Sequence, residues 1–371
     1  MQSQDVDESK SGTRKIQTVG GGSFSVSLPI GWVRDHRVAQ QETLDYVISS
    51  DGKLSFIPAD LTPEDTKVVI KSVSSKTPPD TVLRRIISAI LWAYNEIHVI
   101  SEDELTPPQR KKIREFFSRR TFLGCRTVEI SAKELVVRAD VSYDSYGISS
   151  SLKDMVTKTQ FMCNEVNEIL KGNKKLEDAG AYMTGLDDDV DGIYLYLVRA
   201  IKACSDDERL MIRMGLETGR DCLGYRIVTR HVERVADHLT YVGKTLGELL
   251  SKKEKIPDFL KSDLQDFGVK ACCSFGNVME AFFEKNYDKA DKEIHWIDND
   301  FIKRQNEYES VYGALRIANV MNENLRKEKL NAAIGCQLAS LIQGFLRVAQ
   351  NSKGIGQIVL NLNFKKTLET T

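Results

Sequence analysis

Two pairs of acidic residues stand out in the sequence, because the carboxylates of each pair are four residues apart. Glu233 and Asp237 lie in the stretch RHVERVADH, and Asp187 and Asp191 lie in LDDDVDG. Residues four apart share one face of a helix, where like charges weaken the helix by a few tenths of a kcal/mol. Something must offset this repulsion, either neighbouring arginines or a bound cation.

Two sets of apolar residues flank these acids with the spacing of one helix face. They are Val228, Val232, Val235, Leu239, Val242, Leu246 and Leu249, and Met183, Leu186, Val190, Ile193, Leu197 and Ile201. The spacing predicts two amphipathic helices with the acids at the edge of the buried stripe. If these helices run antiparallel, the four carboxylates converge, and they cannot all stay ionised without a cation. Oxygen ligands suit Mg, Ca, Mn or iron. The candidate metal ligands are Asp187, Asp191, Glu233 and Asp237.

Salt bridging is the alternative explanation of the same pattern. Arg230 and Arg234 each lie three residues before one of the acids. Such helical ion pairs contribute about 0.2–0.5 kcal/mol each. Because acidic stripes are common on the solvated faces of helical bundles, the spacing alone leaves both explanations open.

Helical periodicity extends through nearly all of residues 147–364. Six helices are predicted, over residues 149–171, 175–204, 206–251, 257–285, 287–308 and 310–352. Their connections are short and most carry Gly, Asn, Asp or Pro, which predicts antiparallel neighbours. We therefore expect an all-α part of two tandem three-helix bundles, residues 147–256 and 257–364, that form an internal repeat.

The motifs DDDVD and RHVERVADH resemble those of the PhoU family of phosphate uptake regulators, over roughly residues 150–360. Members of that family are two homologous three-helix bundles whose paired acids bind metal clusters. The resemblance places those acids on the same four residues as above. The second repeat departs from the pattern, because it has LRVAQ at residues 346–350 and Ile302 four residues after Asp298. At most one metal site per chain is therefore expected, in the first bundle.

Residues 13–60 have the pattern of short strands, and the Asp51-Gly52 pair between alternating runs predicts a hairpin. The layout RKIQ…GGGSFSVSLPIGWV…LDYVISSDGKLSFIP resembles the AbrB/MazE/SpoVT swapped-hairpin family. In that family two chains interleave their hairpins into one small barrel that binds DNA. The resemblance implies an N-terminal swapped-hairpin β-barrel and a homodimer. Such a domain ahead of PhoU repeats is typical of archaeal members.

DNA binding is a further implication of this resemblance. The basic residues available for it are Arg14, Lys15, Arg34 and Arg37. Related DNA binders are basic where this chain has Thr18, Val19, Ser27 and Ile30. Four positive charges per chain, doubled in a dimer, still suffice to contact phosphates and release counterions. The alternative is a module that only dimerises and has an ordinary solvated surface.

Between these parts, residues 61–146 have the order strand-helix-strand-helix-hairpin, which predicts a small α/β connector domain. Thr106 is the expected N-cap of its second helix. The whole chain is thus predicted to be a multi-domain α+β protein, with residues 1–12 as a disordered polar tail.

The composition is that of a soluble globular protein, with 41% hydrophobic and 28% charged residues. The net charge of -1 gives no overall bias toward nucleic acid. The seven cysteines include no CxxC pair, which indicates reduced core residues. Because no apolar run approaches the ~20 residues of a membrane span and no signal peptide is evident, we expect a cytoplasmic protein without membrane insertion.

The resemblances together imply a dimeric, DNA-binding transcriptional regulator of phosphate transport. It would sense its signal through a metal ion or through a partner such as a phosphate transporter or a histidine kinase. The alternative is a signalling adaptor that dimerises through the barrel and binds such a partner without touching DNA. A metal-dependent hydrolase is disfavoured, because the sequence has no His-rich ligand set and no phosphate-cradling loop. We therefore expect that the chain is not an enzyme.

Overall fold

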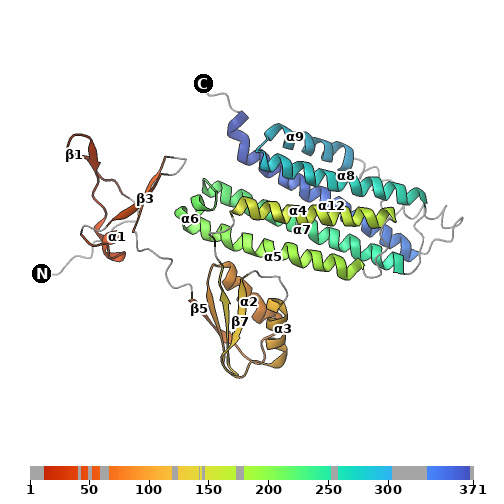
Figure 1. The fold of residues 1–371 in the computed structure, drawn as a ribbon, viewed down its shortest axis with the longest axis horizontal. Helices are drawn as coiled ribbons and strands as arrows, with labels where there is room; N and C mark the ends of the chain where they lie inside the picture. Colours follow the sequence, from red (N-terminus) through yellow and green to blue (C-terminus); the bar gives the residue numbers. More distant parts are fainter. Residues whose placement is uncertain are drawn as a thin grey trace. The chain divides into compact units, whose positions relative to one another are not determined.

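The computed structural model describes residues 12–40, 43–48, 52–58, 67–118, 124–141, 143, 147–172, 179–251, 258–302 and 332–367. The chain divides into two compact units, Met1–Asp65 and Thr66–Thr371, which we call the N-terminal unit and the C-terminal unit. The strands fall in the red to yellow part of the chain, and the long helices follow them from yellow to blue (Figure 1). Among the described helices there is none with the length and hydropathy needed to span a bilayer.

Two antiparallel hairpins and one short helix form the described part of the N-terminal unit. Its elements are β1 (Gln17–Val19), β2 (Ser23–Ser25), α1 (Ile30–Asp35), β3 (Leu44–Ile48) and β4 (Leu54–Pro58). β1 pairs with β2, and β3 pairs with β4. The turn after β1 contains Gly20 with a φ of 64°, a left-handed conformation that glycine adopts without strain.

The described strands of one chain form no closed barrel, because the two hairpins belong to separate two-stranded sheets. The predicted barrel interleaves two chains and therefore stays a prediction. Apolar side chains of this unit are widely exposed in the single chain, among them Ile16 (72%), Phe24 (74%) and Ile48 (66%). Of the predicted Asp51-Gly52 turn, Asp51 lies outside the described residues, as do residues 1–11 of the tail predicted over residues 1–12.

The C-terminal unit begins with a four-stranded sheet and two helices, in the order that the sequence predicted. The elements are β5 (Lys67–Val73), α2 (Pro79–Leu91), β6 (Glu96–Ser101), α3 (Pro107–Ser118), β7 (Cys125–Glu129) and β8 (Glu134–Ala139). The strand order is β5-β6-β8-β7, with β5 and β6 parallel and the other neighbours antiparallel. Ile86 of α2, Ile113 of α3 and Ile97 of β6 are fully buried in one core, so both helices pack on this sheet.

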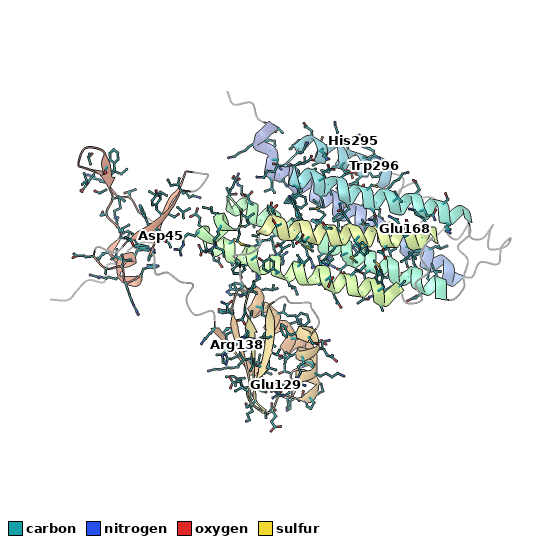
Figure 2. All side chains as sticks on the ribbon, in the orientation of Figure 1. Asp45, Glu129, Arg138, Glu168, His295 and Trp296 are labelled. Atoms are coloured by element: carbon teal, nitrogen blue, oxygen red, sulfur yellow. The ribbon has the colours of Figure 1, made fainter. Side chains whose placement is uncertain are left out.

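Helix α3 begins with Thr106 as its N-cap, as expected, and the cap is reciprocal. The backbone N–H of Thr106 donates to Oε1 of Gln109 at 2.8 Å, and the backbone N–H of Gln109 donates to Oγ1 of Thr106 at 3.4 Å. This capping box satisfies amides that lack partners at a helix start. Farther along α3, Arg110 and Arg114 form ion pairs of 3.3 and 2.7 Å with Glu129 of β7. Figure 2 labels Glu129 on the sheet.

The rest of the C-terminal unit is helical. Its elements are α4 (Ile148–Lys171), α5 (Ala179–Asp206), α6 (Glu208–Arg213), α7 (Gly219–Ser251), α8 (Asp258–Phe283), α9 (Tyr287–Trp296), the π-helix η1 (Ile297–Ile302), α12 (Ala332–Asn363) and the 3₁₀ helix η2 (Phe364–Thr367). The last long helix extends beyond its predicted end at residue 352. Residues 303–331, which include the end of the helix predicted over 287–308, lie outside the described residues.

The single helix predicted over residues 206–251 is wrong, because the chain breaks between α6 and α7. The side chain of Asp207 caps α6 by accepting from the backbone N–H groups of Arg209 and Leu210 at 2.9 and 3.1 Å. Gly215 then adopts a φ of 83°, which a helix cannot accommodate. The apolar spacing continues across this break, which is why periodicity missed it.

One continuous hydrophobic core joins the helices of both predicted bundles. Helix α7 lies at its centre and packs against α4, α5 and α12. Val228, Val232 and Val235 of its predicted apolar stripe have no exposed surface. Gly344 of α12 lies so close to Val242 of α7 that a side chain there would overlap the valine, and this close crossing sets how α7 faces its neighbours.

Candidate functional site

The four predicted ligands lie where α5 packs against α7. Asp187 and Asp191 belong to α5, and Glu233 and Asp237 belong to α7. The carboxylate of Asp237 repels the carboxylates of Asp187, Asp191 and Glu233, and Glu233 also acts on Asp187. The two helices therefore bring both acidic pairs together. We call these four residues the carboxylate cluster.

The acidity of this cluster reflects its surroundings. Burial raises the pKa of Asp187 to about 6, and the negative charge of Asp237 adds to the shift. Burial likewise raises the pKa of Asp191 to about 7, with repulsion from Asp187 as the next cause. Burial and the neighbouring Asp237 raise the pKa of Glu233 to about 7. Each shift has the same physical meaning, which is that a negative charge is poorly accommodated here.

Basic side chains offset part of the repulsion, as the salt-bridge explanation requires. Nη1 of Arg230 lies 2.7 Å from Oε1 of Glu233, and Nη1 of Arg234 lies 3.2 Å from Oδ2 of Asp237. Lys244 lowers the pKa of Asp187 against the larger upward effect of burial. The predicted arginine partners are therefore present, and both belong to α7.

These ion pairs leave two carboxylate oxygens without a partner. Oδ1 of Asp187 and Oε2 of Glu233 are buried and accept no hydrogen bond. Nε of Arg234 is 3.9 Å from Oε2 of Glu233, which is too far for a hydrogen bond. A buried acceptor without a donor costs about 1–3 kcal/mol. The salt bridges thus account for one oxygen of Glu233 and leave the interior of the cluster unsatisfied.

The chemistry of the cluster fits a hard cation, but its side chains are not arranged as a finished site. Within the described part of the chain, no three His, Cys, Asp or Glu side chains are grouped so that they could hold a metal ion as they stand. Carboxylates without a counter-ion repel one another, so their oxygens must rotate inward when a cation binds.

The two histidines beside the cluster have other roles. Nδ1 of His231 lies 3.0 Å from Oδ1 of Asn351, which places its ring against α12 rather than α5. Burial lowers the pKa of His238, although the neighbouring Asp237 acts in the opposite direction. A neutral His238 adds no positive charge to the cluster.

In the second half of the helical part, a lysine lies at the position that corresponds to a residue beside the carboxylate cluster. Nζ of Lys353 on α12 lies 2.6 Å from Oδ1 of Asp298 in η1. If residues 346–350 match residues 233–237, then Lys353 matches Thr240, the residue that hydrogen-bonds to Asp187. The ammonium group of Lys353 thus neutralises Asp298, the acid of the paired motif that remains in the second repeat. Sequence reasoning missed Lys353, although it lies seven residues after Leu346 and hence on the same helix face.

An aromatic residue on α5 extends the cluster. The guanidinium groups of Arg226 and Arg230 lie 5.7 and 5.6 Å from the centre of the Tyr194 ring. Arg230 therefore contacts Glu233 and Tyr194 at once, which fixes its side chain by a cation–π interaction and an ion pair. The sequence analysis did not single out Tyr194, which lies three residues after Asp191 on the same helix.

The four predicted DNA-binding residues lie in the N-terminal unit. Arg14, Lys15, Arg34 and Arg37 are all exposed. Arg34 is in α1 and Arg37 follows it with a φ of 52°. Within the described residues, no ion pair with a carboxylate is formed by any of the four. Beside them the ring of His36 stacks on Trp32 at 4.8 Å.

Comparison with solved structures gives a similarity of fold. No family model matches the sequence. No curated protein matches it either. A solved structure described as "Crystal structure of PhoU from Pseudomonas aeruginosa" superposes with a TM-score of 0.46 and 15% identity, over 59% of this chain and 96% of that one. A similarity of this size supports no statement about what the chain does.

Proposed function

We propose that the chain is a regulator of phosphate uptake of the PhoU kind, in which the carboxylate cluster holds one divalent or iron cation. The observation that carries this proposal is the pair of buried, unpartnered oxygens of Asp187 and Glu233. They lie among acids whose pKa values are raised by burial and mutual repulsion. The resemblance of RHVERVADH and DDDVD to PhoU motifs supplies the link to phosphate uptake.

The residues of the site have separable roles in this proposal. Asp187 and Asp191 reach the cation from α5, and Glu233 and Asp237 reach it from α7. When bound, the cation supplies the positive charge that the cluster lacks. Arg230 and Arg234 hold the outer oxygens of Glu233 and Asp237, so the remaining oxygens are free to turn inward. Because the ligands come from two helices, cation binding strengthens the packing of α5 on α7.

Metal analysis of the purified chain tests the cluster. We expect one equivalent of manganese or iron to remain with the wild type after gel filtration, and little to remain with Asp191→Asn or Glu233→Gln. Asp206→Asn is the matched control, because it removes an exposed carboxylate from the same helix as Asp191. Equal metal content in all four proteins would contradict the proposal.

The N-terminal unit would act as the dimerising, DNA-binding part of a cytoplasmic transcriptional regulator. Its exposed apolar side chains support pairing with a second chain, because they have no other cover in the described residues. Arg14, Lys15, Arg34 and Arg37 would contact phosphates. The helical part would then take its signal from the cation, or from a phosphate transporter or histidine kinase, and alter the placing of the two DNA-binding surfaces.

A gel-shift titration across a salt series separates the regulator from the adaptor. We expect the chain to bind its own promoter, and log K to fall linearly with log of the salt concentration, because phosphate contacts release counterions. A variant with Arg14, Lys15, Arg34 and Arg37 all changed to Gln should bind far more weakly and with a shallower salt slope, while it remains a dimer by light scattering. Absence of binding at low salt would favour the adaptor, which dimerises and binds a transporter or kinase without DNA.

A further inference from the structure

A histidine lies between two carboxylates on the face of the sheet that α2 and α3 do not cover. Ile97 and Val99 of β6 are buried in the core beneath these helices, so His98 between them points to the opposite face. Nε2 of His98 lies 2.8 Å from Oε1 of Glu96, and its Nδ1 lies 2.9 Å from Oε1 of Glu134. Since Glu96 belongs to β6 and Glu134 to β8, the histidine side chain joins two neighbouring strands.

The two contacts together determine the charge of His98. An ionised carboxylate only accepts hydrogen bonds, and a neutral imidazole has one N–H donor and one acceptor nitrogen. One ring satisfies two ionised carboxylates only when both of its nitrogens carry a proton. The geometry therefore fits an imidazolium. A neutral ring would direct a nitrogen lone pair at a carboxylate oxygen.

The two glutamates do not depend on His98 equally. Oε1 of Glu96 also lies 3.6 Å from Nζ of Lys67 in β5, and its Oε2 lies 3.3 Å from Nε of Arg138 in β8. Within the part of the chain that the structure describes, His98 supplies the only ion pair of Glu134. Loss of the positive charge of His98 therefore leaves Glu96 with two cations, whereas Glu134 loses its counter-ion.

We propose that His98 is a pH-sensitive switch that holds the Glu134 side chain against β6 as an imidazolium and releases it when Nδ1 loses its proton. That proton goes to water, and the Nε2–H continues to donate to Glu96. The β7–β8 turn itself stays in place, because Nη2 of Arg110 donates to the carbonyl oxygens of Ser131 and Ala132 at 2.7 and 2.6 Å. Release thus adds a negative charge without a counter-ion to the open face of the sheet.

The electrostatic surroundings set the pH at which this switch operates. The hydrogen bond with Glu134, and then that with Glu96, raise the pKa of His98 above 6.5, while burial acts in the opposite direction. In agreement, the hydrogen bond from His98 lowers the pKa of Glu96. Because the pKa of the folded state is raised, the stability from this contact is fully present below about pH 6.5 and is lost as the pH rises through the folded value.

Other charged residues of the same face limit the rise of this pKa, because most of them are positive. The cations that the strand register places on this face are Lys67, Lys71, Arg126 and Arg138. Arg126 is neutralised by Asp140, whose Oδ2 lies 3.1 Å from its Nη2. The two glutamates are the acids in direct contact with His98, so their removal is the sharpest probe of the switch.

A pH titration of the histidine rings by nitrogen NMR, on the full chain with labelled histidine, tests the proposal. The chain has five histidines, and His98→Gln identifies the signal of His98 by its absence. We expect two protonated ring nitrogens at pH 6 and a midpoint above 6.5 in the wild type. Glu134→Gln should lower that midpoint, whereas Glu104→Gln, which changes an exposed carboxylate between β6 and α3, should leave it unchanged. A wild-type midpoint at or below 6.5, or an equal midpoint in Glu134→Gln, would overturn the proposal.

The neutral form gives a second test that a merely structural contact would not pass. Above the midpoint, the remaining ring proton should be on Nε2, facing Glu96, and a proton on Nδ1 would contradict the release of Glu134. Urea denaturation of the wild type, His98→Gln, Glu134→Gln and the double variant measures how strongly the two residues are coupled. This coupling should be present at pH 6 and lost at pH 9. An equal coupling at both pH values would show a fixed hydrogen bond and no switch.

Discussion

Replacement of Arg199 by Met is expected to destabilise the C-terminal unit by about 3 kcal/mol, because it leaves several buried carbonyl groups without a donor. Among the residues that the structure describes, Arg199 is the largest fully buried side chain, and it has no exposed surface. Its guanidinium donates to the backbone oxygens of Ala93 at 3.1 Å and Tyr94 at 2.9 Å. It also donates to the carbonyl of Ile90 and to the side-chain oxygen of Asn95.

These acceptors lie at and just after the C-terminal end of α2, where a positive charge also meets the negative end of the helix dipole. One α5 residue thereby ties the sheet and its helices to the helical bundle. Arg199 is eight residues from Asp191, or roughly 12 Å along the same helix. The helix that supplies half of the carboxylate cluster is therefore also the anchor of the α/β part.

Urea denaturation of the full chain measures this effect. The free energy of unfolding of Arg199→Lys should lie between those of the wild type and Arg199→Met. A lysine keeps the charge but cannot reach all the acceptors. Lys202→Met is the surface control. It removes a cation 5.1 Å from the centre of the Trp92 ring, an exposed interaction of about 0.5–1 kcal/mol. If Arg199→Met lost no more free energy of unfolding than Lys202→Met, the buried hydrogen bonds of Arg199 would not be what holds the sheet and its helices to the helical bundle.

Asp191→Asn is expected to stabilise the cation-free chain at pH 7.5, by on the order of 1–2 kcal/mol. Its pKa rises from 3.8 in the unfolded chain to about 7 in the folded one. A raised pKa means that the folded state holds the proton more tightly. The stability that this group contributes is therefore fully present below about pH 4 and is lost as the pH rises through 7. Asp187 and Glu233 act in the same direction, with pKa values of about 6 and 7. Because part of each carboxylate faces water, the full ~1.4 kcal/mol per pKa unit is reduced.

The measurement is the free energy of unfolding at a series of pH values from 4 to 8, with and without a divalent cation. Comparison of Asp191→Asn with the wild type cancels the acids of the α/β part, such as Glu96, whose pKa a hydrogen bond from His98 lowers. The variant should have the flatter profile. Manganese should stabilise the wild type at pH 7.5 and have no effect on the variant. A variant less stable than the wild type at every pH would mean that the aspartate is a structural partner and not a strained ligand.

Several features of the fold follow from local patterns that need only neighbouring residues. The apolar stripe from Val228 to Leu249 predicted a helix and its buried face, and the structure buries that stripe. Thr106 as the N-cap of α3 followed from its place directly before Pro107. The pairing of Arg230 with Glu233 followed in the same way, because residues three apart on a helix are always neighbours.

Other features did not follow from such patterns. The break at Asp207 and Gly215 was missed, because apolar periodicity continues past it. The closed barrel stays a prediction, because it depends on contacts between two chains.

The sequence by itself determined that the acidic pairs lie on two helices, which faces of those helices are buried, and that each acidic pair borders a buried face. Only the tertiary structure decided that the pairs meet, that Lys353 neutralises Asp298, and that Arg199 binds the end of α2. The physical reason is the range of the interactions. Spacing along one helix is set by its own geometry, whereas contacts between residues about 40 to 110 positions apart depend on how each helix is rotated and how closely it crosses its neighbours.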